Sequence, residues 1–195
     1  MSLPSVLRVF FAIPIPADFK KKLARYILEL QKQSKTHTIS WSRGHHLHIT
    51  LQFLAEIRTE DIPSLVESVR TSIKTNPYSF IITLGELHFF PNPFRPRVIV
   101  LNITPTEAIN ALADSVGKGI AHIHYPIDHR PFKAHLTLGR IKKAPHLHLD
   151  FLEQVKKPDF GEFLVNEVIL FRSEPQENGS KYTEMDKIYL IQASP

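Results

Sequence analysis

Two short segments of the sequence combine a histidine, a threonine and two aliphatic residues in the same order. The first, His48–Leu51, is His-Ile-Thr-Leu, and the second, His135–Leu138, is His-Leu-Thr-Leu. Alternate side chains of a β-strand share one face, so the imidazole and the hydroxyl of each segment lie together, opposite the aliphatic side chains. Each segment is therefore predicted to be a strand that buries its aliphatic residues and presents one histidine and one threonine to a cleft.

Two histidines and two threonines that meet across a cleft can handle a phosphate ester. Histidine has an ordinary pKa near 6.5, so it can donate or accept a proton near neutral pH. In-line displacement at phosphorus places the nucleophile and the leaving group on opposite sides, which suits His48 on one side and His135 on the other. The hydroxyls of Thr50 and Thr137 can hold the non-bridging oxygens. The residues alone leave open which histidine is the acid and which is the base.

Composition narrows the class of protein. The chain has 195 residues, a net charge of +5 and no cysteine. Disulfides, zinc–thiolate sites and thiol catalysis are therefore excluded, and the absence of cysteine fits a reducing cytoplasm, where we expect the protein. The positive charge favours an anionic partner, either nucleic acid or a phosphorylated small molecule. The apolar run Val6–Pro16 contains Arg8 and is too short to span a bilayer, so it is predicted to be a buried strand rather than a membrane segment.

The order of the expected elements occurs twice. Each half follows the pattern strand, helix, His-x-Thr strand, helix, strand, with a first repeat over about 6–90 and a second over about 97–191. The segment Pro91–Pro96 separates them, because its prolines cannot continue a helix or a strand. We expect an α+β fold in a single two-lobed domain, 1–195. Its two pseudo-symmetric lobes each hold an antiparallel-rich sheet with helices on the outer side, and the active-site cleft lies between them.

Some element boundaries can be predicted from single residues. Asp18 and Thr106 are expected to cap the first and third long helices, and Pro63 is expected in the first turn of the second. The last two strands are expected at about 162–172 and 182–191.

The paired His-x-Thr segments resemble those of the two-histidine phosphoesterase superfamily. Within it, the chain resembles the bacterial and archaeal 2′-5′ RNA ligase-like proteins, also called RNA 2′,3′-cyclic phosphodiesterases. The segments Arg8–Pro16, His46–Ile57 and Arg130–Ile141 follow that family's pattern. Two departures are visible: Ala55 stands where the family usually has glycine, and Ala134 stands where proline commonly precedes the second histidine.

The resemblance implies a metal-independent enzyme that opens terminal 2′,3′-cyclic phosphates of RNA to 2′-phosphates and can also join RNA ends reversibly through 2′-5′ linkages. It implies that His48 is the proton donor and His135 the proton acceptor. Arg130 and Lys133 flank the second motif and are expected to bind substrate, with Arg130 near its phosphate. The expected partner is RNA with 2′,3′-cyclic phosphate ends, tRNA halves among the candidates, and the protein is expected to be a monomer.

A metal site is one alternative, because the sequence is rich in histidine pairs. These lie in three groups: His45, His46 and His48; His122 and His124; and His146 and His148. Acidic residues and cysteines are missing from familiar ligand spacings around them, so no metal or other cofactor is expected.

Two further alternatives concern the substrate and the activity. The chain could be a non-catalytic RNA-binding module, with Trp41, Phe89, Phe90 and Phe94 as stacking surfaces for bases. It could also be a cyclic phosphodiesterase that acts on a small nucleotide or on an ADP-ribose cyclic phosphate, because paired His-x-Thr segments alone do not separate these substrates.

Overall fold

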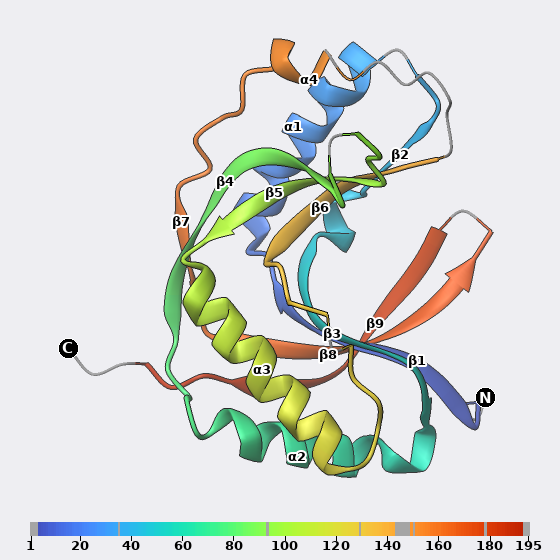
Figure 1. Ribbon diagram of the computed structural model, residues 1–195, viewed down its shortest axis with the longest axis vertical. Helices are drawn as coiled ribbons and strands as arrows, with labels where there is room; N and C mark the ends of the chain where they lie inside the picture. Colours follow the sequence, from blue (N-terminus) through green and yellow to red (C-terminus); the bar gives the residue numbers. More distant parts are fainter. Residues whose placement is uncertain are drawn as a thin grey trace.

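The structure is a computed structural model that describes residues 4–34, 36–92, 94–128, 130–142, 149, 151–177 and 179–192. The predicted α+β class is confirmed, with two antiparallel sheets and flanking helices (Figure 1). In chain order the elements are β1 (Val6–Pro14), α1 (Ala17–Ser34), β2 (Ile39–Trp41), the 3-10 helix η1 (Gly44–His46), β3 (His48–Arg58), the 3-10 helix η2 (Thr59–Asp61), α2 (Ile62–Ile73), β4 (Phe80–Phe90), β5 (Val98–Thr104), α3 (Thr106–His122), β6 (His135–Ile141), α4 (Phe151–Gln154), β7 (Glu162–Val165), β8 (Glu167–Gln176) and β9 (Gly179–Tyr189).

The two sheets each combine strands from both halves of the chain. Sheet A has the order β3-β1-β8-β9, and sheet B has the order β2-β6-β5-β4-β7. Sheet A therefore takes two strands from each half, whereas sheet B takes β2 and β4 from the first half and the other three from the second. The expected repeats follow one another in sequence, but the sheets do not coincide with them. The two halves interlock, and the space between the sheets is built from both.

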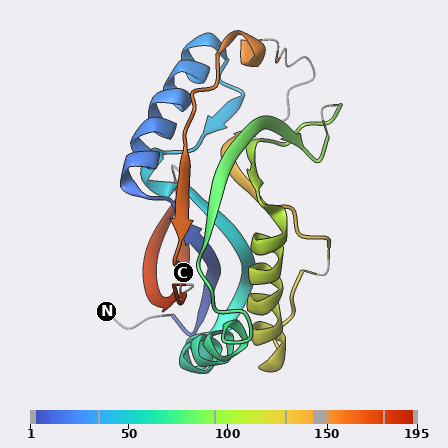
Figure 2. The same ribbon diagram turned by 90° about the vertical axis from the view of Figure 1, so that its left-hand side faces the viewer.

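The long helices cover the two sheets. Figures 1 and 2 show α2 and α3 side by side against sheet A and α1 beside sheet B. Phe19 of α1 packs edge-on against Phe163 of β7, with ring centroids 4.8 Å apart. Where α3 crosses α2, a Cβ built on Gly119 would lie 2.5 Å from the Cα of Val69, so only glycine lets the helices approach this closely. None of the described helices is long and apolar enough to cross a membrane.

The two His-x-Thr strands alternate as their sequence predicts. Ile49 and Leu51 of β3 and Leu136 and Leu138 of β6 are at most 3% exposed and belong to the hydrophobic core. The histidine and the threonine of each strand are half-buried instead. Burial of the aliphatic residues therefore fixes which face of each strand carries the polar pair.

The structure corrects several boundaries. The segment expected as one strand over 162–172 is two strands in different sheets, because the chain passes from sheet B to sheet A at Asn166. Asp18 lies within the first turn of α1 rather than before it, and Thr106 is the first residue of α3, whose N-cap is Pro105 without a side-chain cap. Pro63 does lie in the first turn of α2. Strand β2 was not predicted from the sequence, because three residues are too few for a periodic pattern.

Candidate active site

The two His-x-Thr pairs line one cavity between the sheets. Strands β3 and β6 belong to different sheets but contact each other, and the cavity beside them has a volume of about 250 Å³. His48 and Thr50 form one wall, and His135 and Thr137 form another. The structure thus brings together the four side chains that the sequence singled out.

A bulge follows the threonine in both strands. Ala12 of β1 pairs with Thr50 while the preceding Phe11 pairs with Gln52, so Leu51 is the extra residue. In β6, Val100 and Ile99 of β5 pair with Thr137 and Gly139, so Leu138 is the extra residue. A bulge shifts the alternation of the side chains that follow it. The two strands therefore carry the same irregularity directly after their polar pairs, in agreement with a pseudo-symmetric arrangement.

Both histidines are held by the carbonyl group two residues before them. The Nδ1 atom of His48 lies 2.6 Å from the carbonyl oxygen of His46, and Nδ1 of His135 lies 2.6 Å from the carbonyl oxygen of Lys133. A carbonyl oxygen can only accept, so Nδ1 carries the proton and donates it in each bond. The Nε2 atom of each ring is left for proton transfer in the cavity.

His48 lies in a more aromatic environment than His135. Its ring centroid is 4.7 Å from that of Phe10 and 5.3 Å from that of Tyr182, which meets it edge-on. Burial lowers the pKa of His48 to about 4, although the bond to the carbonyl of His46 opposes this shift. The charges of His46, Lys20 and Arg140 contribute to the same lowering of the pKa. In the free protein at pH 7, His48 is therefore a neutral imidazole.

His135 is shifted in the same direction. Burial is the main cause of its lowered pKa, the charge of Arg140 adds to it, and the bond to the carbonyl of Lys133 opposes it. The ring of Phe90 packs edge-on against this imidazole at a centroid distance of 4.9 Å. The cavity without substrate thus favours neutral imidazoles on both sides, and a bound phosphate anion would favour the protonated form of either ring.

These shifts predict the pH dependence of turnover. One histidine must be neutral and the other protonated, so the pH–rate profile should be bell-shaped. Because the pKa values of His48 and His135 both lie below 6.5, we expect kcat/KM, which reports the free protein, to be maximal below pH 6.5. The maximum of kcat should lie at higher pH, because the bound anion raises both pKa values. Steady-state kinetics from pH 4 to 9 measures both profiles, and a kcat/KM maximum above pH 8 would contradict this.

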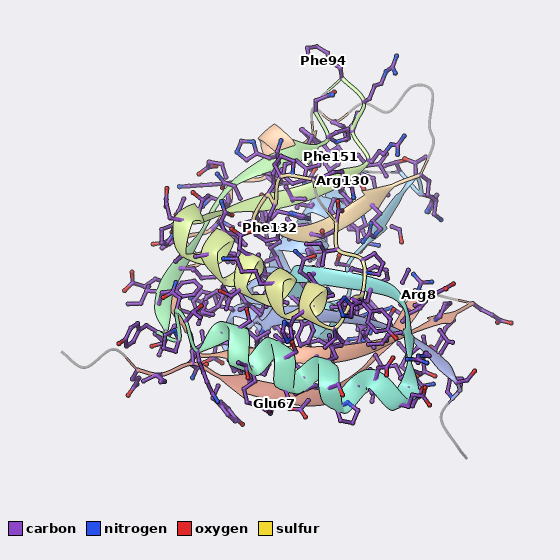
Figure 3. The ribbon with its side chains drawn as sticks, turned by 60° about the horizontal axis from the view of Figure 1, so that its bottom comes forward. Arg8, Glu67, Phe94, Arg130, Phe132 and Phe151 are labelled. Atoms are coloured by element: carbon purple, nitrogen blue, oxygen red, sulfur yellow. The ribbon has the colours of Figure 1, made fainter. Side chains whose placement is uncertain are left out.

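Arg130 and Lys133, which the sequence analysis expected at the substrate, do not line the cavity. The guanidinium of Arg130 pairs with the carboxylate of Asp128 two residues earlier, with Nε 2.9 Å from Oδ1, and its side chain is 86% exposed. It lies in the loop that precedes β6 (Figure 3). The ammonium of Lys133 lies 5.8 Å from the ring centroid of Phe90. Lys133 contacts the site through its backbone carbonyl oxygen, which accepts the hydrogen bond from Nδ1 of His135.

Arg140 is a cation of the cavity that was not expected from the sequence. It lies on β6, lines the cavity, and its charge acts on the pKa values of His48 and His135. Its spacing from Thr137 would place it on the opposite face of an unbroken strand. The bulge at Leu138 changes that alternation, which explains how Arg140 lines the same cavity as Thr137.

Strand β2 closes the cavity beside Arg140. Ser40 pairs with Arg140 across the strands, and the hydroxyl of Ser42 donates to the carbonyl oxygen of Thr137 at 2.9 Å. Trp41 packs over Gly139, where an added Cβ would lie 3.1 Å from the indole ring. The β8–β9 hairpin extends on the other side (Figure 1), and its Ser180 and Tyr182 complete the wall.

The histidines expected for a metal site and the aromatic residues expected for an RNA-binding module do not form a common site in the described part of the chain. Within the described ranges, three or more histidines and carboxylates nowhere gather as a metal site would require, and His146 and His148 lie outside the described residues. Trp41 lines the cavity, Phe89 packs on the core and Phe90 packs on His135. Phe94 is 93% exposed, lies at the outer tip of the β4–β5 loop (Figure 3) and does not line the cavity.

Comparisons with known proteins identify the family. Residues 19–177 match the model of the 2′-5′ RNA ligase superfamily. The chain belongs to this superfamily. The resemblance seen in the sequence is thereby confirmed.

Several relatives match over nearly their whole length. An Archaeoglobus fulgidus protein named RNA 2′,3′-cyclic phosphodiesterase is 27% identical, over 92% of this chain and 98% of its own. A Methanocaldococcus jannaschii protein of the same name is 29% identical, over 90% and 96%. The crystal structure of a Thermus thermophilus protein superposes with a TM-score of 0.75 at 28% identity, covering 94% of this chain and 98% of that one. The two-sheet architecture is therefore that of the superfamily.

Proposed function

We propose that this member of the 2′-5′ RNA ligase superfamily opens terminal 2′,3′-cyclic phosphates of RNA by acid–base catalysis with His48 and His135. The prediction of a cyclic phosphodiesterase is confirmed by the family match and by relatives that carry this activity in their names. The observation that carries the mechanism is the cavity in which two imidazoles from different sheets each keep Nε2 available.

The two histidines divide the proton transfers. His135, as the neutral base, takes a proton from water as its oxygen attacks phosphorus. His48, as the acid, gives a proton to the ribose oxygen as the bond between that oxygen and phosphorus breaks. Placement on strands of different sheets suits in-line geometry, and the carbonyl bonds at Nδ1 hold both rings in place for transfer. Because His48 is neutral in the free protein, its proton is taken up together with the anionic substrate.

The remaining polar groups stabilise the phosphate. The hydroxyls of Thr50 and Thr137 donate to the two non-bridging oxygens, one from each strand. The guanidinium of Arg140 balances the negative charge of the pentacoordinate transition state, and its planar donors suit phosphate oxygens. We assign to Arg140 the phosphate contact that the sequence analysis expected of Arg130.

The assignment of the acid determines which bond breaks. If His48 lies beside O3′, the 3′ oxygen departs and the product carries a 2′-phosphate. An RNA 5′-hydroxyl in the position of the water can attack the cyclic phosphate instead. The bond between phosphorus and O3′ then breaks, and a 2′-5′ linkage forms with the same two proton transfers. Which RNA supplies the cyclic phosphate, tRNA halves among the candidates, stays a prediction, as do the monomeric state and the cytoplasmic location.

The mechanism requires no metal ion, because protons and fixed donors supply each catalytic function. We expect an oligonucleotide that ends in a 2′,3′-cyclic phosphate to be opened at the same rate in buffer and in excess chelator. Added Mg²⁺, Mn²⁺ or Zn²⁺ should change the rate by less than about twofold. The conversion can be followed by anion-exchange chromatography. Loss of turnover in chelator, with recovery on addition of one of these ions, would contradict the two-histidine mechanism.

A further inference from the structure

A second cavity adjoins the first at His48. It has a volume of about 330 Å³, and its wall includes His46, His48 and Tyr182, which also line the first cavity. Its other walls come from the start of α1, from η1 and from β9. The proposed phosphate contacts of Thr50, Thr137 and Arg140 all lie in the first cavity, so the second cavity has no assigned ligand.

Cations and imidazoles surround this second cavity. Lys20 of α1 donates to the carbonyl oxygen of His45 at 3.5 Å, which keeps its ammonium beside η1. The ring of His45 lies 4.1 Å from that of His46, which lies 4.9 Å from that of Tyr182. These contacts form a continuous path from the ammonium of Lys20 to the wall that the two cavities share.

Strand β9 adds a second ammonium and one carboxylate to the lining. Lys181 and Glu184 both come from β9. The carboxylate of Glu184 lies 3.3 Å from the ammonium of Lys187, so its charge is already paired. The described lining therefore carries an excess of positive charge, and an anion next to His48 fits it.

The chemistry of the proposed reaction indicates which anion this is. His48 stands beside O3′ of the terminal ribose, so the ribose lies on the His48 side of the phosphorus and its 5′ oxygen leads away from the cyclic phosphate. The next charged group along an RNA chain is the phosphodiester that joins the terminal nucleotide to its predecessor. We propose that the second cavity binds this phosphodiester through Lys20 and Lys181. This inference rests on the proposed function and makes RNA of two or more nucleotides the preferred substrate.

The test compares a dinucleotide that ends in a 2′,3′-cyclic phosphate with the matching mononucleoside cyclic phosphate. The wild-type protein should prefer the dinucleotide by roughly tenfold in kcat/KM, the order expected of a charge-assisted phosphate contact. In the double variant Lys20→Ala/Lys181→Ala the preference should fall to about one. The control variant Lys21→Ala/Lys32→Ala removes the same charge from exposed positions of α1 that line neither cavity, and it should keep the preference.

A neutral linkage separates charge from contact with the extra nucleoside. A dinucleotide with a methylphosphonate linkage and a 2′-deoxy upstream residue keeps both bases but loses the phosphodiester charge. The wild-type protein should open this neutral dinucleotide with the same kcat/KM as the mononucleoside cyclic phosphate. The lysine variants should leave the ratio of these two kcat/KM values unchanged. An unchanged preference in the lysine variants, or a wild-type preference that survives the neutral linkage, would overturn the subsite.

The proposed function and the subsite can fail separately. Turnover of the mononucleoside cyclic phosphate by the wild-type protein tests the proposed function without the second cavity. If neither substrate were opened, the proposed function would fail, and calorimetric titration with the dinucleotide and mononucleotide 2′-phosphates would still decide the subsite. Tighter binding of the dinucleotide that disappears in the lysine variants would support it, and equal affinities in the wild-type protein would refute it.

Discussion

Alanine in place of either His48 or His135 is expected to lower kcat by roughly 10²–10⁴-fold, the range for loss of a general acid or base. The fold should survive, because both imidazoles face the cavity and the core side chains of β3 and β6 are untouched. Steady-state hydrolysis of an RNA oligonucleotide with a cyclic phosphate end measures the loss, and thermal unfolding of each variant checks that it is folded.

The matched control is His88→Ala. His88 is an exposed histidine on β4 that lines neither cavity, so its replacement should leave kcat within about twofold of the wild type. In the double variant His48→Ala/His135→Ala, the loss should be much smaller than the product of the single losses, since the two groups act in one reaction. Full activity in either folded single variant would contradict the division of proton transfers.

Replacement of Arg140 by alanine is expected to lower kcat/KM by roughly 10²–10³-fold, as for the loss of one fixed donor to a developing charge. Arg140→Lys should recover part of the activity, because it keeps the charge and loses the planar pair of donors. Removal of this positive charge should also raise the pKa values of His48 and His135, since Arg140 lowers both. The kcat/KM profile of Arg140→Ala should therefore move to higher pH.

Arg130→Ala provides the comparison for Arg140. Arg130 is largely exposed, pairs with Asp128 and does not line the cavity, so its loss should change kcat/KM by less than about threefold. A large loss of kcat/KM in Arg130→Ala together with a small loss in Arg140→Ala would contradict this assignment and favour Arg130 as the phosphate contact.

Local periodicity explains why the histidines and threonines could be found from the sequence. Residues two apart on a strand share a face, so His48 with Thr50 and His135 with Thr137 needed no tertiary information. Arg140 could not be found in this way, because the bulge at Leu138 changes the alternation after Thr137. A bulge depends on pairing with β5, and that pairing joins residues distant in sequence.

The sequence also did not predict which strands belong to which sheet. The run from 162 to 172 is apolar enough to predict a single strand, yet the chain changes sheets at Asn166, and nothing in the local pattern marks that change. The order of elements could be predicted from the hydrophobic pattern, but the pairing of β1 with β8 could not. Both cavities depend on such long-range pairing. The second cavity, with Lys20 and Lys181 in its lining, was therefore not expected from the sequence.

The orientation of the cyclic phosphate between His48 and His135 is the central claim, and phosphorus NMR of the hydrolysis product tests it most directly. The substrate is an RNA dinucleotide with a 2′,3′-cyclic phosphate end, incubated with the purified protein in excess chelator. With the acid at His48 beside O3′, the product should be the 2′-phosphate, which phosphorus NMR distinguishes from the 3′-phosphate. A product that consists mainly of the 3′-phosphate would contradict the orientation of the substrate and, with it, the expected 2′-5′ ligation.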